Sequence, residues 1–290
     1  MRAPVFDPER HLSKKALEAS KLPISLSEKR SDKKILSKGL SPSYRAMPNH
    51  IARASLFAPI ARGRKVVHFR TLLASRCDAV MTYSGEQFNE QQADVWMQLI
   101  FESRNIELGK PTTMKRAKFL KDIGRSTSGR DYRWLKETMV AFTAATLVIE
   151  VFSPDGRQKY SVGQHKAFHM MSSFDYDPIT DTYTFIIDPQ WQLIFGIREY
   201  SLIDWNKRMR IRKGQDLAKA IQRIICASSN REQKFELQDL KYTLQYGSPM
   251  NKFRRSLREA IAELTRVGII ENATFKCLKS GEEGLVIWRC

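Results

Sequence analysis

Two stretches of the sequence combine basic side chains with the apolar spacing of an amphipathic helix, which suits binding to a polyanion. In the first, residues 129–146, Arg130, Arg133 and Lys136 lie away from the apolar side of the predicted helix. In the second, which ends at Val267, basic residues lie off the apolar stripe and gather in the first turns. Cationic groups there would be placed to contact phosphate and base edges in a DNA major groove.

The turns around these helices carry further hydroxyl and basic groups. Arg157 and Lys159 follow the first helix and Lys276 and Lys279 follow the second, where a hairpin wing would bind phosphate. The predicted DNA contacts are Arg125, Ser126, Ser128, Arg130, Arg133, Lys136, Arg157, Lys159, Asn251, Lys252, Arg254, Arg255, Arg258, Lys276 and Lys279. The alternative, an ordinary amphipathic helix with a solvated charged face, explains either helix alone equally well. Two such helices in matching contexts favour DNA.

The composition supports the same interpretation. The chain of 290 residues has a formal net charge of +18 and a pI near 9.9, which favours a polyanionic partner. No apolar run approaches the roughly 20 residues that span a bilayer, and residues 1–20 lack the apolar segment of a signal peptide. We therefore expect a cytoplasmic protein without a membrane partner. The 4 cysteines form no C-x-x-C pair, which predicts free thiols and no zinc.

The elements that would position the basic residues occur twice in the same order. Helix, turn, helix, strand, turn and strand is the order of a winged helix. The first set is predicted over residues 89–104, 111–114, 115–123, 129–146 and a hairpin around 154–156. The second is predicted over residues 213–227, 235–237, a helix to 246, a helix to 267 and a hairpin around 280–281.

These patterns predict an α+β fold with two tandem winged-helix domains. We expect the first domain over residues 46–197 and the second over residues 198–290. Residues 1–45 mix Lys, Ser, Glu and Pro without sustained apolar periodicity, so they are expected to form a flexible basic tail.

Several segments resemble the TrfA-type plasmid replication initiators. The most specific is Arg-Ala-Met-Pro-Asn at residues 45–49, and the similarity continues through residues 82–85, 94–96, 129–132 and 262–269. It extends from Arg45 to the end of the chain. The resemblance implies binding to iterons, the repeated sequences of a plasmid origin. It also implies opening of an adjacent A+T-rich segment and recruitment of the host replicative helicase and DnaA.

The resemblance also bears on assembly, because initiators of this family pass between inactive dimers and DNA-bound monomers. Edge strands predicted over residues 148–185 could pair with a second copy, which favours a homodimer in equilibrium with a monomer. A second partner is suggested by Arg53-Ala-Ser-Leu-Phe57, which is similar to sliding-clamp-binding peptides although Arg stands where their Gln would be. Leu56 and Phe57 would insert into the clamp. We favour the alternative, that both residues pack at the start of the fold.

No constellation in the sequence points to catalysis. Gly124 and Gly129 have the spacing of a phosphate-binding loop, but Arg130 and Asp131 replace its Lys and Ser/Thr. His165 and His169 lie in a predicted strand without a third metal ligand. We expect no catalytic residue, metal or cofactor, and no enzymatic activity. A DNA-binding repressor or partition protein remains the main alternative to an initiator, and a nuclease or relaxase is disfavoured.

Overall fold

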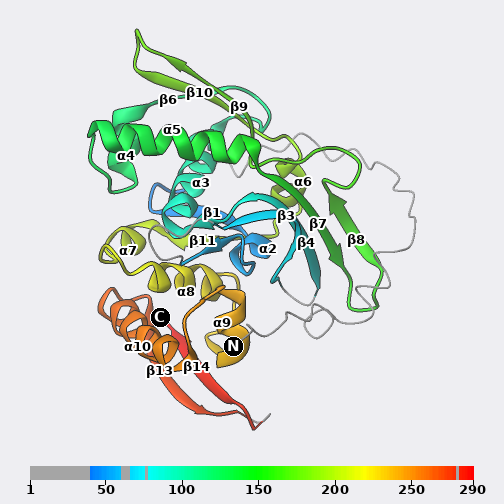
Figure 1. Ribbon diagram of the computed structural model, residues 1–290, viewed down its shortest axis with the longest axis vertical. Coiled ribbons are helices and arrows are strands. Elements are labelled where there is room, and N and C mark those ends of the chain that lie inside the picture. Colours follow the sequence, from blue (N-terminus) through cyan, green and yellow to red (C-terminus); the bar gives the residue numbers. More distant parts are fainter. Residues whose placement is uncertain (1–39, 60–65, 76–77, 279–280) are drawn as a thin grey trace.

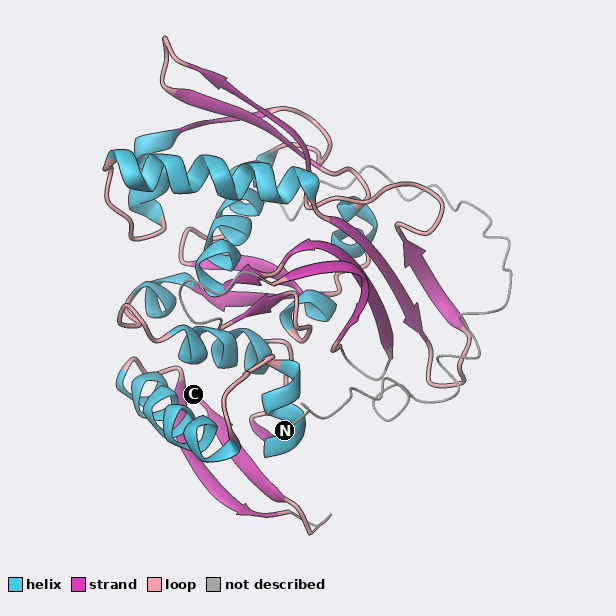
Figure 2. Cartoon of the chain, viewed as in Figure 1, coloured by secondary structure: helices cyan, strands magenta, loops and turns pink. Residues whose placement is uncertain are grey.

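The computed structural model describes residues 40–59, 66–75, 78–278 and 281–290 and has α+β architecture (Figures 1 and 2). The expectations for residues 1–39 and for Lys279 lie outside the described residues. Within those ranges, no helix is both long and apolar enough to cross a membrane.

The first unit of the fold surrounds the helix predicted over residues 129–146, which is α5 (Gly129–Ala144). It contains α3 (Glu90–Glu102), β6 (Thr112–Lys115), α4 (Arg116–Asp122), α5, β9 (Met171–Asp177) and β10 (Thr182–Ile187). The strands form an antiparallel sheet in the order β6-β10-β9. Asn89 begins α3 because its side chain accepts hydrogen bonds from the backbone amides of Gln91 and Gln92, while the Gln92 side chain accepts from the Asn89 amide.

A second sheet, which we call the inserted sheet, contains the two strands that lie between α5 and β9 in the chain, and it corrects one prediction. Its strands are β3 (Val67–Leu73), β4 (Ala79–Glu86), β7 (Thr146–Phe152) and β8 (Gln158–Val162), in the order β3-β4-β7-β8. The hairpin predicted around residues 154–156 therefore forms, but it does not join the sheet beside α5. The buried residues of β7, Leu147, Ile149 and Val151, lie opposite Tyr83, Met81 and Ala79 of β4. Burial against β4 commits β7 to this sheet, so the next hairpin, β9–β10, pairs with β6.

The second unit repeats the topology of the first. It contains α8 (Asp216–Cys226), β12 (Glu232–Glu236), α9 (Leu237–Thr243), α10 (Met250–Arg266), β13 (Ile270–Cys277) and β14 (Glu283–Arg289). Its antiparallel sheet has the order β12-β14-β13. In both units the first strand pairs with the third and the third with the second. The two units therefore share one strand order, with β9–β10 as the hairpin of the first unit in place of the one predicted around residues 154–156.

The remaining described elements belong to neither three-stranded sheet nor to its helices. They are β1 (Tyr44–Pro48), α2 (Asn49–Ala52), β2 (Phe57–Ala58), β5 (Phe88–Asn89), η2 (Ser103–Asn105), α6 (Trp191–Gly196), β11 (Tyr200–Asp204) and α7 (Trp205–Met209). β1 pairs with β11, and Ile203 and Trp205 belong to the same hydrophobic core as the first unit. A separate core fills the second unit. Residues on both sides of position 197 thus share the first core.

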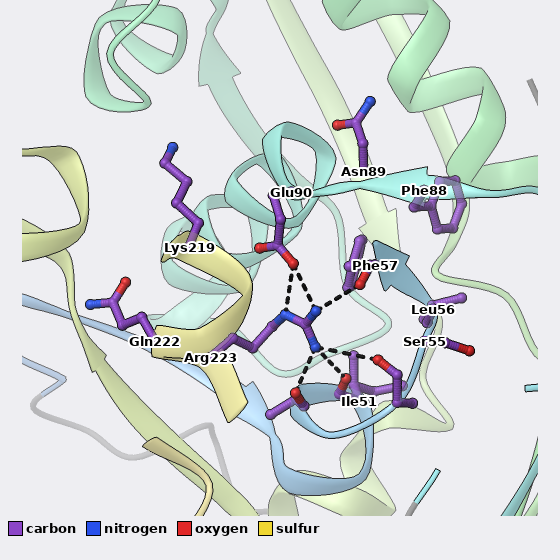
Figure 3. Close-up of polar contacts among 12 residues, drawn as sticks. Ile51, Ser55, Leu56, Phe57, Phe88, Asn89, Glu90, Lys219, Gln222 and Arg223 are labelled. Atoms are coloured by element: carbon purple, nitrogen blue, oxygen red, sulfur yellow. Dashed lines mark hydrogen bonds and ion pairs between the residues drawn. The ribbon is translucent and has the colours of Figure 1, made fainter. Parts of the chain in front are cut away.

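A buried ionic network, which we call the joint, fastens α7 and α8 to α3. Arg208 of α7 is 0% exposed and bonds Asp94 at 2.5 Å and Glu90 at 3.0 Å. Arg223 of α8 donates to Glu90 at 2.7 Å and to backbone carbonyl oxygens in the segment from Ile51 to Phe57 (Figure 3). Burial alone would raise the pKa of Asp94, but the neighbouring charges of Arg208 and a lysine of α8 hold it below its usual value.

Candidate nucleic-acid interface

The basic face of α5 is solvent-exposed, as the sequence predicts. Arg130, Arg133 and Lys136 are exposed, whereas Leu135 and Met139 on the opposite side are fully buried. The three cations line a groove of about 1040 Å³ between α5 and the segment that joins β4 to α3. An exposed cationic side on a helix whose other side is buried is the arrangement that major-groove contact requires.

The turn before α5 is held together by Asp131. Arg125 donates to Asp131 at 2.7 Å and lies 3.3 Å from the centre of the Trp134 ring. Ser126 and Ser128 also donate to Asp131, and the Ser126 hydrogen bond is the largest cause of the lowered pKa of that carboxyl group. Burial lowers the pKa of Arg125. The polar groups predicted to contact DNA in this turn therefore also fix its shape.

Polar side chains that the sequence did not single out line the opposite wall of the α5 groove. Gln87 lies just before α3, and Gln91 and Gln92 lie in its first turn. Gln87 is largely occupied, since its amide donates to the carbonyl oxygens of Ser55 and Leu56. No pattern in the sequence places these amides beside α5, because the two segments are about 40 residues apart and meet only through the tertiary fold.

α10 presents a second basic face. Phe253 and Leu257 are buried, whereas Arg255 and Arg258 are exposed. Asn251 and Lys252 are also exposed, in the first turn of the helix.

Several of the basic side chains of α10 have contacts within the second unit. Arg254 forms a two-pronged ion pair with Glu283 of β14, and Arg255 lies 3.3 Å from Glu259. The Arg258 guanidinium lies 5.1 Å from the centre of the Phe275 ring on β13.

The two hairpins beside these helices differ in charge. Lys276 is exposed on β13, next to the turn of the second hairpin. The β9–β10 hairpin, residues 171–187, contains no Lys or Arg and several aspartates. Ile179 at its turn is 93% exposed. Phosphate binding by a hairpin wing is therefore supported by the side chains of the second unit and not by those of the first.

Arg157 and Lys159 do not occupy the position predicted for them. Both lie in the β7–β8 region of the inserted sheet, outside the three-stranded sheet of the first unit. Arg157 pairs with Asp155 at 2.6 Å, and Lys159 pairs with Glu199. Their assignment to a wing beside α5 is corrected, for the reason given above: β7 is committed to pairing with β4.

Leu56 and Phe57 are buried, which bears on the sliding-clamp hypothesis. Both are 0% exposed, and the Phe57 ring lies 5.7 Å from that of Phe88. The Phe57 carbonyl oxygen accepts a hydrogen bond from Arg223. Both side chains are thus packed inside the fold, and the structure favours packing over clamp binding. Among the described residues, no three His, Cys, Asp or Glu side chains are grouped to hold a metal ion.

Two units of one topology, each with a basic helix on its surface, define a DNA-binding protein in a chain of net charge +18. A family model described as "TrfA protein" matches residues 34–277. The chain belongs to the TrfA family of plasmid replication initiators.

Solved structures resemble this fold at low sequence identity. A selenomethionine derivative of domains 2 and 3 of RctB aligns with a TM-score of 0.53 at 10% identity, covering 83% of this chain and 96% of that one. A second structure of RctB domains 2–3 aligns with a TM-score of 0.50 at 12% identity, covering the same shares of the two chains. The Pi initiator protein in complex with iteron DNA aligns with a TM-score of 0.48 at 12% identity, covering 80% of this chain and 99% of that one. No curated protein sequence matches the chain significantly.

Proposed function

We propose that this initiator binds double-stranded iteron DNA through two tandem winged-helix domains, with α5 and α10 in successive stretches of major groove. The observation that carries the proposal is the repeated strand order, first-third-second, with a basic helix before the hairpin in each unit. In a winged helix that helix is the one that enters the groove. The two helices lie at separate levels of the molecule, with α7 and α8 between them (Figure 1).

The two domains would hold the duplex differently. In the second, α10 would contact bases through Arg255 and Arg258 while Lys276 of the hairpin contacts phosphate. In the first, α5 would carry the contact alone, since the β9–β10 hairpin has no Lys or Arg with which to bind phosphate. The ion pair between Arg254 and Glu283 is exposed and therefore costs little to exchange for a contact with DNA.

Family membership supports the later steps of initiation. We infer that binding promotes opening of an adjacent A+T-rich duplex and that the protein recruits the host replicative helicase and DnaA. We also propose that it acts without catalysis or a cofactor of its own, in the cytoplasm. A monomer in equilibrium with a homodimer is consistent with the exposed edge strands β3 and β9.

The test is a nuclease footprint on DNA flanking the gene in its own replicon, followed by permanganate probing for unpaired thymines. We expect protected repeats and reactive thymines in a neighbouring A+T-rich stretch. The matched control is an Arg254→Ala, Arg255→Ala, Arg258→Ala variant, which should lose the footprint while keeping its fold by circular dichroism. Protected repeats without reactive thymines would instead indicate a repressor or partition protein. Absence of any protected repeat would refute iteron binding.

A further inference from the structure

The linker between α7 and α8, residues 210–215, carries three exposed cations that belong to neither basic helix and to neither hairpin. They are Arg210, Arg212 and Lys213. The linker leaves α7 and enters α8 between α5 and α10 (Figure 1). Arg212 and Lys213 line a cavity of about 290 Å³ together with Arg125 and Arg130, which belong to the start of the α5 region. Cations from the linker and from the first unit thus share one surface depression.

The linker is fixed at its ends by the joint. Arg208, which is fully buried against Glu90 and Asp94, lies two residues before it. Lys219, four residues after its end, pairs with Asp94 as well. One acidic pair of α3 therefore anchors both the helix that precedes the linker and the helix that follows it.

The middle of the linker is held against the C-terminal part of α10. The Arg212 backbone amide donates to the Glu263 carboxylate at 2.7 Å, and Arg266 donates to the Arg210 carbonyl oxygen at 2.8 Å. Gly214 adopts φ +88°, a backbone conformation that other residues rarely take. Among the described residues no atom lies within 4 Å of the position a Cβ would take, so glycine is required for this φ and not for close packing. The linker is a preorganised surface, and groups already in place lose less entropy on binding.

The side chain of Arg212 remains available to a ligand. It is 70% exposed, and its ion pair with Glu263 is long, at 3.8 Å, to a carboxylate that Arg266 already contacts at 2.6 Å. Lys213 is exposed beside it. Two neighbouring cations on a fixed backbone, next to an exposed arginine of α5, suit a phosphate of the DNA backbone.

We propose that the linker is a third DNA contact, in which Arg212 and Lys213 bind phosphates between the segments held by α5 and α10. This inference rests on the proposed function: if both helices reach one duplex, the surface between them faces the DNA between their sites. Phosphates there are the same in every sequence, so the contact adds affinity and fixes the register of the two units without selecting bases.

The experiment measures binding of the full chain with Arg212→Ala and Lys213→Ala to the footprinted repeat and to a scrambled duplex, at several salt concentrations. The log-log salt slope should fall by about two on both duplexes, because each phosphate that is no longer neutralised lowers it by about 0.9. The preference for the repeat over the scrambled duplex should be unchanged. An Arg212→Lys, Lys213→Arg variant should keep the slope, because it keeps both charges.

The charge-matched control is Arg157→Ala with Lys166→Ala, which removes two exposed cations that flank β8 in the sequence. β8 and α7 lie on opposite sides of the molecule (Figure 1). Its salt slope should equal that of the wild type. If the linker variant behaves like this control, the linker contact is refuted and the proposed function stands. If the wild type does not prefer the footprinted repeat, the proposed function is refuted, and the slopes on the scrambled duplex still decide whether the linker touches phosphate.

Discussion

The first and second units share an order of elements and an order of strands, yet their surfaces differ where DNA would meet them. The hairpin of the second unit carries Lys276, and that of the first carries aspartates and no Lys or Arg. The helices differ as well: Arg254 and Arg255 of α10 are engaged in exposed ion pairs, whereas α5 places its cations along a groove. The shared topology therefore fixes the positions of the basic helix and the hairpin in each unit. The surface charge of each element decides whether it can bind phosphate.

The largest expected effect concerns the joint that holds the two units together. Arg223→Leu removes one of the two arginines that donate to Glu90, and it removes the donor for the carbonyl oxygens of residues 51–57, leaving these acceptors buried. We expect a loss of about 3–5 kcal/mol in the free energy of unfolding, measured with urea at neutral pH. The matched control is Arg231→Leu, whose ion pair with Glu271 is exposed, so that its removal should hardly change the free energy of unfolding. Equal losses in the two variants would mean that the joint does not stabilise the contact between units.

The next effect separates base contact by α10 from simple attraction to charge. Arg258→Ala should weaken binding to the footprinted repeat by about 1–3 kcal/mol and relax the preference at one base position. Binding to the scrambled duplex should weaken much less, as judged by fluorescence anisotropy titrations on both DNAs. An equal loss on both duplexes would assign Arg258 to phosphate, and no loss on either would remove it from the interface.

The comparison of the hairpins predicts a smaller difference. Lys276→Ala should lower the log-log salt slope by about one on every duplex, because one phosphate is then left without its cation. Asp175→Ala, an exposed position in the first hairpin, should leave the slope unchanged if that hairpin stays more than a screening length of about 10 Å from DNA. Tighter binding by Asp175→Ala would show that the first hairpin lies near phosphate. The two hairpins would then differ because the first repels the DNA backbone and the second binds it.

The smallest effect is a pH dependence confined to the second unit. Hydrogen bonds from Arg266 lower the pKa of Glu263 to about 2, from its ordinary value of 4.5. A depressed carboxyl pKa contributes stability that is present above the ordinary value and is lost as the pH falls toward 2. Glu263→Gln should therefore lose less stability than the wild type between pH 4.5 and 2, in denaturant midpoints measured across that range. Parallel curves for both proteins would contradict the assignment.

The helices on which the interface depends follow from the sequence alone. Periodic apolar residues predict α5 and α10, and their ends agree with the observed bounds to within about two residues. The order of elements in the second unit is also predicted, because they follow one another without an insertion. Local signals suffice there, since each element pairs with the next or with the one after it.

Contacts between elements that are far apart in the chain became known only from the tertiary structure. The sequence contains two hairpins after α5. No local pattern shows that β7 pairs with β4, some 65 residues earlier, and so leaves the sheet beside α5. The bonds of Arg223 to Glu90 and to the Phe57 carbonyl oxygen link segments more than 130 residues apart. Periodicity reports which face of an element is apolar, but the partner of that face is chosen by packing of the whole chain.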